Sequence, residues 1–333
     1  MNEQSLLNCL RENPFVLAPM AGITDRPFRS FMREMGCGIV VSELVSATGL
    51  KYSSAKTRKL MEFAPDQHPV GIQLFGENLE HLSEAALMVQ DLGADFVDLN
   101  FGCPVPKVVN KGAGSACLKD VHRLAQVIRA TKSKVSIPVT IKIRTGWDQN
   151  SRNSLEVARA AADEGAAWVA IHGRTRAAAY SGQADWDYIK WVKSESPLPI
   201  IGNGDIHSAD QARDRLRTSG CDGVMIGRGC LKNPWIFSQS LGLGAEGHYL
   251  NLLGRLRQHL EDFYPERLVG LQMKKFAVWY SAGLPGASQF RKTVFGQQDF
   301  QQTLSTIDRF FENLDPKSRA DTSHEPFLMG GHG

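Results

Sequence analysis

The most restrictive feature of this sequence is a regular alternation between short apolar segments and longer helical patterns. Eight of the segments are short, rich in β-branched residues and mostly continuous in their apolar character. Such segments are typical of strands that other elements cover on both faces in a parallel sheet. The expected strands are residues 15–18, 39–42, 70–74, 96–99, 139–143, 168–171, 199–202 and 223–226.

Helical patterns separate these segments, and several end at a glycine such as Gly93, Gly165 or Gly220. Glycine readily adopts the left-handed conformation that closes many helices. Eight strand–helix units in roughly 240 residues predict a TIM barrel, the closed (β/α)8 fold of the α/β class. An open, doubly wound sheet is the alternative, but no Gly-x-Gly-x-x-Gly pattern follows the first strand.

A barrel of this kind carries its chemistry where the strands end. Nearly every expected strand ends in a polar, donor-rich residue, whereas the strand bodies are apolar. One such residue is ordinarily a satisfied loop group, but a whole ring of them predicts a site. In strand order these residues are Pro19-Met20-Ala21-Gly22, Glu43, Gln73, Asn100 with Cys103, Lys142 with Arg144, His172 with Arg174, Asn203-Gly204-Asp205 and Gly227-Arg228-Gly229.

Cys103 stands in the loop that leaves the fourth strand, three residues after Asn100 and before two glycines, Gly112 and Gly114. This placement predicts a reactive thiol held over a pocket. The alternative is a small buried hydrophobic residue, which is the commonest role of a free cysteine. Residues 104–115 are a candidate lid, with a merely solvated loop as the alternative.

The loops after the seventh and eighth strands of such barrels often bind a phosphate. Gly204 and Gly227 would let backbone N–H groups approach an anion, and Arg228 would add a fixed charge. Donors at other strand ends suit a wide, flat ring rich in carbonyl groups. Lys142 could instead form a Schiff base, but that leaves Cys103 without a role.

Composition restricts the possible functions less than the strand-end residues do. The formal net charge of +3 is compatible with a nucleic-acid partner without demonstrating one. Residues 1–13 lack a signal-peptide pattern, and no apolar run has the length of a membrane helix. The six cysteines are dispersed, without zinc-site spacing. We therefore expect a reduced, cytoplasmic, monomeric protein without a metal or a membrane segment.

Several ordered motifs resemble those of the tRNA-dihydrouridine synthases, and the bacterial B-type branch is the most similar. They are APMAGITDRPFR at 18–29, NFGCP at 100–104, KIRTGW at 142–147, HGRTR at 172–176, NGD at 203–205 and GR at 227–228. The similarity extends into 274–280 and 290–292. It implies an enzyme that reduces D-loop uridines of tRNA, position 17 being favoured, to 5,6-dihydrouridine. It also implies FMN as cofactor and NADPH, or NADH, as electron donor.

The resemblance also implies roles for individual residues. Pro19, Met20 and Ala21 would line the flavin, Gln73 and Lys142 would hold its ring, and His172, Asn203, Gly204, Asp205, Gly227 and Arg228 would surround its phosphate end. Asn100 would contact the target uracil, with Arg144 nearby. Cys103 would be the general acid that protonates C5 after a hydride reaches C6. An apolar loop favours the protonated thiol, and the target base must leave its stack.

The pattern changes after residue 240. We expect a catalytic barrel over 1–241, a small helical tRNA-binding domain over 242–314 and a disordered tail over 315–333. Lys274, Lys275, Arg291 and Lys292 are the expected phosphate contacts. The alternative is a solvated charged surface above core aromatic residues. Residues 5–13 look helical, unlike the short β lead-in expected of the family.

Two other functions stay open. One is a flavin barrel that acts on a free small pyrimidine, which would not need the basic helical domain. The other is a non-catalytic tRNA-binding protein, which would not need Cys103 and the ring of strand-end donors.

Overall fold

The computed structural model describes residues 1–243, 247–312, 314 and 320. Eight parallel strands form one sheet in the order β1-β8-β7-β6-β5-β4-β3-β2. The strands are β1 (Phe15–Leu17), β2 (Val40–Ser46), β3 (Val70–Phe75), β4 (Phe96–Phe101), β5 (Val139–Arg144), β6 (Val169–His172), β7 (Ile200–Asn203) and β8 (Gly223–Ile226). The sheet closes because Val16 bridges Ile39, and the Leu17 N–H donates to the Ile39 carbonyl at 2.9 Å. The structure thus confirms the TIM barrel and excludes the open sheet.

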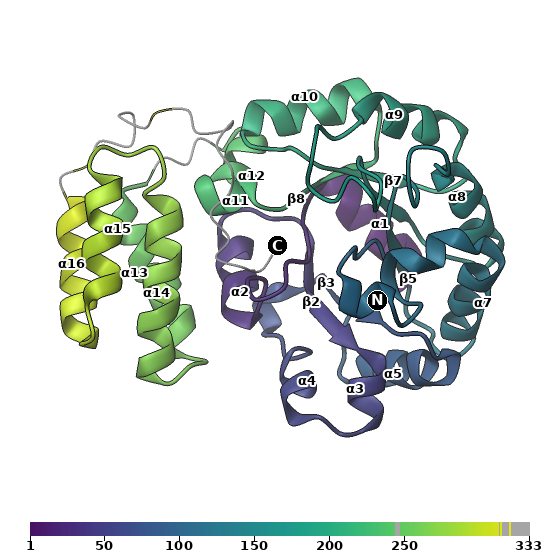
Figure 1. Cartoon of the computed structure of the whole chain (residues 1–333), viewed down its shortest axis with the longest axis horizontal. Coiled ribbons are helices and arrows are strands. Elements are labelled where there is room, and N and C mark those ends of the chain that lie inside the picture. The colour runs from purple at the N-terminus through teal and green to yellow at the C-terminus, as the bar shows by residue number, and fades with distance from the viewer. Residues whose placement is uncertain (244–246, 313, 315–319, 321–333) are drawn as a thin grey trace.

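Helices surround this barrel on its outside (Figure 1). Asp25 begins α2 by accepting a hydrogen bond from the Phe28 N–H at 3.0 Å, and Gly220 ends α10 with φ +68°. The helices of the barrel are α2 (Arg26–Glu34), α3 (Ala47–Lys51), α4 (Ala55–Lys59), α5 (Leu79–Asp91), α6 (Pro106–Val109), α7 (Val121–Lys132), α8 (Ser154–Asp163), α9 (Trp186–Glu195), α10 (Ala209–Ser219), α11 (Gly229–Lys232) and α12 (Ile236–Ser240).

The helix α1 (Glu3–Glu12) precedes the barrel and closes its amino end. Leu6 and Leu10 are buried in one apolar cluster with inward-facing strand residues such as Val16 and Trp168. The expected helix at 5–13 is therefore confirmed, and its apolar face explains it. Because α1 covers one end of the barrel, the carboxyl ends of the strands are left to form the site.

The remaining chain forms helices that stand beside the barrel, next to α2 and α11 (Figure 1). They are α13 (Tyr249–Glu261), α14 (Glu266–Tyr280), α15 (Ala287–Gly296) and α16 (Phe300–Glu312). Phe276 of α14 stacks on Phe28 of α2 with 5.0 Å between ring centroids, so one hydrophobic core runs through both parts. Almost all of the expected disordered tail lies outside the described residues. Within the described part, no helix has the length and apolar character needed to cross a membrane.

Candidate functional site

The structure brings the predicted strand-end residues together at the carboxyl rim of the barrel. Lys142 donates to the side-chain oxygen of Asn203 at 3.2 Å, and Asn203 donates to the Met225 carbonyl at 2.7 Å. The guanidinium carbon of Arg228 lies 4.9 Å from the centre of the Tyr180 ring. Residues from β5, β7, β8 and the loop after β6 thus border one region.

A line of hydrogen bonds crosses the neighbouring strands and ends at the Cys103 loop. Thr140 and Gln73 each donate to Asp98 at 2.6 Å. Asn100 donates to the Gln73 carbonyl oxygen at 2.8 Å and accepts from the backbone N–H of Cys103 at 2.9 Å. Each of the two amide groups keeps a second N–H that these bonds do not use, which can donate to a ligand.

Cys103 is held by its backbone while its thiol stays protonated. Its carbonyl oxygen accepts from the Ser115 N–H at 3.1 Å and from the Ser115 hydroxyl at 2.9 Å. Burial raises the pKa of the thiol and outweighs the opposing effect of Arg144 and Lys142. The side chain is partly accessible rather than sealed in the core, so the alternative of a small buried hydrophobic residue is not supported. A protonated thiol at a strand end can act as a general acid.

The cationic groups of the rim are shifted by burial and by one another. Burial and the neighbouring Arg144 lower the pKa of Lys142 to about 8. Burial, with Lys142 and Arg144, also holds the pKa of His172 well below its usual range. A neutral imidazole offers one donor and one acceptor. The rim is therefore suited to hold an anionic, hydrogen-bonding ligand.

Arg144 is engaged within the protein. Its guanidinium donates to the carbonyl oxygens of Gly102 at 2.9 Å, Thr175 at 2.9 Å and Ala179 at 2.7 Å. It thus ties the Cys103 loop to the loop after β6. If Arg144 contacts a uracil, as expected, it must do so while it keeps these three hydrogen bonds.

The expected phosphate region is preorganised by a partly buried ion pair. Asp205 accepts two hydrogen bonds from Arg174, at 2.9 and 3.0 Å, and one from the Ala184 N–H at 2.7 Å. Burial alone would raise the pKa of Asp205, but these hydrogen bonds outweigh burial and lower the pKa. Asp205 therefore fixes the loop after β7 and leaves anion binding to other groups. Arg174, one of the expected strand-end donors, uses guanidinium N–H groups to hold Asp205.

Two glycines of this region lie where neighbouring loops approach each other. Gly204 has φ +129°, and a Cβ there would lie 2.5 Å from Ala184 and 3.2 Å from His172. A Cβ on Gly227 would lie 3.7 Å from the sulfur of Met20. Gly204 is thus required because Ala184 and His172 leave no room for a side chain, and the loops after β1 and β8 lie close together at Gly227. The cationic and amide groups of the rim are of the kind that a phosphorylated, flat cofactor needs.

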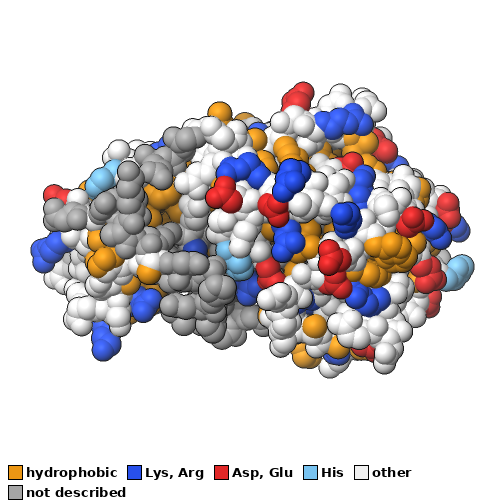
Figure 2. Space-filling view, turned by 90° about the horizontal axis from the view of Figure 1, so that it is seen from above, with side chains coloured by type: hydrophobic (Ala, Val, Ile, Leu, Met, Phe, Trp, Pro, Cys, Tyr) orange, Lys and Arg blue, Asp and Glu red, His pale blue; other side chains and the backbone are white. Residues whose placement is uncertain are grey.

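The four expected tRNA contacts of the helical part differ in their surroundings. Lys275 donates to the Gly22 carbonyl at 2.8 Å, and Lys274 donates to the Gln297 carbonyl. Arg291 is half-buried and Lys292 is exposed. On the face shown in Figure 2, basic and acidic side chains are interspersed over the barrel half, so charge does not mark an RNA surface on this face.

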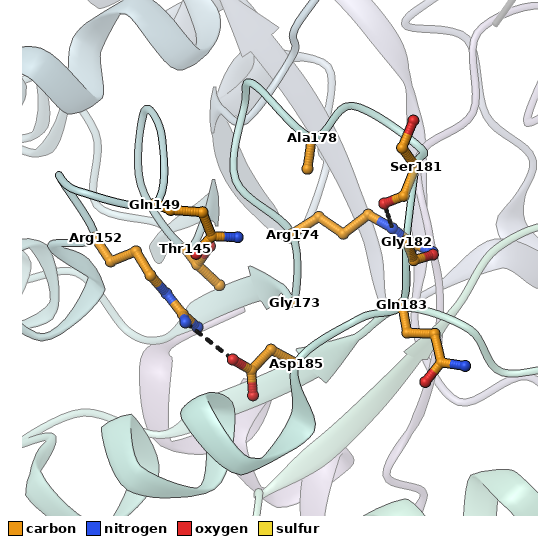
Figure 3. Close-up of a pocket in the computed structure, with 10 residues that line it drawn as sticks. All are labelled: Thr145, Gln149, Arg152, Gly173, Arg174, Ala178, Ser181, Gly182, Gln183 and Asp185. Atoms are coloured by element: carbon orange, nitrogen blue, oxygen red, sulfur yellow. Dashed lines mark hydrogen bonds and ion pairs between the residues drawn. The ribbon is translucent and has the colours of Figure 1, made fainter.

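A cavity of about 370 Å³ lies outside this site, between the loops after β5 and β6. Its lining includes Arg174, one of the predicted strand-end donors, but neither Cys103 nor Lys142. Figure 3 shows Arg152 facing Asp185, which it contacts at 2.9 Å, and Arg174 turned toward Ser181. The cavity therefore adjoins the loop after β6 and does not contain the predicted acid.

Strand-end side chains that converge on one rim of a closed barrel define the class as a TIM-barrel enzyme. The chain belongs to the dihydrouridine synthase family, whose model, described as "Dihydrouridine synthase (Dus)", matches residues 16–315. Two relatives support this. The tRNA-dihydrouridine synthase B of Pseudomonas syringae pv. tomato is 39% identical over 315 residues, which is 90% of this chain and 91% of the relative. A probable tRNA-dihydrouridine synthase of Rickettsia prowazekii is 39% identical over 309 residues, 90% and 94% of the two chains.

Solved structures confirm the fold alone. A 6-hydroxypseudooxynicotine amine oxidase from Pseudomonas geniculata N1 matches with a TM-score of 0.54 and 15% identity, over 70% of this chain and 47% of that one. Histamine dehydrogenase from Rhizobium sp. 4-9 matches with a TM-score of 0.51 and 14% identity, over 69% and 46%.

Sequence reasoning missed three contacts at this rim. Asp98 was part of the expected strand, yet it is 2% exposed and anchors the hydrogen bonds that reach Cys103. An acidic residue inside an apolar strand was the available signal. Tyr180 is 48% exposed, and its ring lies near the guanidinium groups of Arg144 and Arg228. No pattern in the sequence pointed to Tyr180. The Lys275 contact with the loop after β1 also had no sequence signal.

Proposed function

We propose that this protein is a cytoplasmic tRNA-dihydrouridine synthase that uses FMN and NADPH to reduce a D-loop uridine, with position 17 favoured. The observation that carries the proposal is the protonated Cys103 thiol, held at the end of β4 in a member of the dihydrouridine synthase family. Relatives that are 39% identical over 90% of the chain carry that activity in their names.

The rim residues divide between cofactor and substrate. Pro19, Met20 and Ala21 line the cofactor, and Gln73 and Lys142 hold the edges of its ring. His172, Asn203, Gly204, Gly227 and Arg228 surround its phosphate end, with Asp205 fixing the loop beneath. The bound flavin supplies the hydride that reaches C6 of the uracil.

Cys103 then completes the reduction. Asn100, with Arg144 behind the loop, orients the uracil through its free N–H. As the C5=C6 bond is reduced, the Cys103 thiol gives its proton to C5, and the resulting thiolate regains a proton from solvent. Lys142 faces the charge that develops on the carbonyl oxygen during this step.

The experiment is reconstitution of the purified protein with FMN, NADPH and an unmodified tRNA transcript. Dihydrouridine is mapped in the product by mass spectrometry, with free uridine as a parallel substrate. We expect reduction of the tRNA at one D-loop position and none of free uridine. Reduction of free uridine alone would favour the pyrimidine enzyme. A protein that binds tRNA but neither retains flavin nor forms product would be the non-catalytic binder.

A further test addresses the phosphate end. The Arg228→Ala variant should release FMN at least tenfold more readily, because a charge-assisted hydrogen bond is lost. The Arg217→Ala variant, on the exposed face of α10, should retain FMN like the parent protein. Equal retention in both variants would remove Arg228 from the phosphate site.

A further inference from the structure

Asp98 occupies an unusual position for a carboxylate. It lies in β4 between the buried residues Val97 and Leu99 and is itself only 2% exposed. Asn100 follows two residues later, so both side chains point to the same face of the strand. A carboxylate at such a place is costly unless its oxygens accept hydrogen bonds. The hydrogen-bond partners of Asp98 therefore indicate its structural role.

These partners come from the two adjacent strands in one row. Gln73 of β3 and Thr140 of β5 are the direct register neighbours of Asp98. Thr140 donates to one carboxylate oxygen and Gln73 to the other, each at 2.6 Å. Burial raises the pKa of Asp98, and these two bonds oppose that effect.

The hydrogen bonds beyond Asp98 all run in one direction. The backbone N–H groups of Gly102 and Cys103 donate to Asn100, at 3.2 and 2.9 Å, and Asn100 donates to Gln73 at 2.8 Å. Gln73 then donates to Asp98. An amide could take either orientation, but a backbone N–H only donates and an ionised carboxylate only accepts. The direction of the line is therefore set at both ends, and Asp98 supplies the acceptor that the Gln73 amide needs.

We propose that Asp98 is a positioning residue for the proton transfer, which supplies the final acceptor of this hydrogen-bond line and thereby holds Gln73, Asn100 and the Cys103 loop in place. This inference rests on the proposed function. If the line were reversed, Asn100 would turn its NH2 group toward the N–H of Cys103, and the loop would lose its anchor. A displacement of about 1 Å at the thiol can reduce the rate on the order of 100-fold.

A double-mutant cycle tests this role. In Asp98→Asn, the new amide can donate to the Thr140 hydroxyl, which can still donate to the Val97 carbonyl at 3.5 Å, so its oxygen remains for Gln73. In Thr140→Val, the carboxylate still accepts from Gln73. Each single change should lower kcat by less than about fivefold. Together they leave the new NH2 group either unpaired against valine, which cannot accept a hydrogen bond, or facing the NH2 group of Gln73. Neither placement pairs every N–H, so the line loses its support at Asp98 only in the double variant.

The Asp98→Asn/Thr140→Val protein should therefore lose kcat by at least tenfold more than the product of the single effects. Its FMN absorbance and its KM for tRNA should stay near those of the parent protein. A general loss of structure would instead change all three quantities. If circular dichroism shows that the double variant is unfolded, Asp98→Val replaces it, because it removes the acceptor and leaves Thr140 its bond to Val97.

Additive effects, or loss confined to FMN retention or to the KM for tRNA, would overturn the role of Asp98 in positioning Cys103. A double variant that turns over like the parent protein would do the same. An unsubstituted protein that makes no dihydrouridine would overturn the proposed function itself, so the two failures are distinguishable.

Discussion

The ammonium nitrogen of Lys142, at the end of β5, lies 3.2 Å from the side-chain oxygen of Asn203, at the end of β7. The contact spans the intervening strand β6. It places a lysine whose pKa is lowered to about 8 beside the region where the cofactor ring is expected. Below that pKa the folded protein therefore holds a cation here at the expense of its own stability.

Lys142 makes the stability of the cofactor-free protein depend on pH. Its folded pKa of about 8 lies below the unfolded value of about 10.4. Between these values the unfolded chain binds a proton that the folded chain does not, so stability rises with pH. Relative to Lys142→Met, the parent protein should gain up to roughly 3 kcal/mol from pH 7 to pH 10.5. Urea unfolding at several pH values measures this, and a constant difference would contradict it.

Replacing the thiol should separate chemistry from binding. Cys103→Ala should keep its flavin and its affinity for tRNA but lose turnover by about 100- to 10,000-fold, the usual range for a general acid. Cys103→Ser should be similarly impaired, because a hydroxyl is a much weaker acid than a thiol. Single-turnover formation of dihydrouridine, with flavin absorbance as the control, is the measurement. Turnover equal to that of the parent protein would assign the proton to another group.

The ion pair between Arg174 and Asp205 should matter for folding far more than an exposed pair. Arg174→Met leaves a carboxylate that is only 24% exposed and should lower the free energy of unfolding by about 3 kcal/mol. Arg217→Met breaks the exposed pair with Asp214 and should cost less than about 1 kcal/mol. Urea denaturation compares the two, and equal losses would show that the buried pair is not the anchor of the loop after β7.

The basic residues of the helical part should fall into two groups in tRNA binding. Exposed Lys292 should contribute to the salt dependence, so that Lys292→Ala lowers the slope of log K against log salt by about 1. Lys275→Met should leave that slope unchanged, because its ammonium already binds the Gly22 carbonyl at 2.8 Å. Filter binding between about 50 and 200 mM salt provides the test. A lowered slope in Lys275→Met would instead show that Lys275 contacts the RNA.

The barrel and the helical part were predictable because their signals are local. A continuous apolar segment buries both faces wherever it is placed, and an amphipathic helix shows its buried stripe in its spacing. The predicted strands match the observed ones closely, although β2 runs on to Ser46 instead of ending at residue 42. Glu43 thus lies within the strand, where its carboxylate accepts from the Gly22 N–H.

The ring of site residues was also predictable, since the ends of parallel strands in a closed barrel must meet at one rim. The partners of each side chain were not. Arg144 and Lys275 are long, flexible cations whose sequence neighbours do not reveal the carbonyl groups that they bind. Asp98 differs, because a carboxylate inside an apolar strand is itself a signal in the sequence. The sequence did not show that Gln73 and Thr140 are its hydrogen-bond partners.

The sequence by itself determined the barrel, the added helices and which residue types stand at the strand ends, because each depends on periodicity and chain order. Only the tertiary structure decided which of these side chains hold the loops and which keep donor groups that no loop uses. Those choices depend on hydrogen bonds between segments far apart in the chain, such as Arg144 with Ala179 or Gln73 with Asp98. Such bonds form only after the closed sheet has brought their donors and acceptors together.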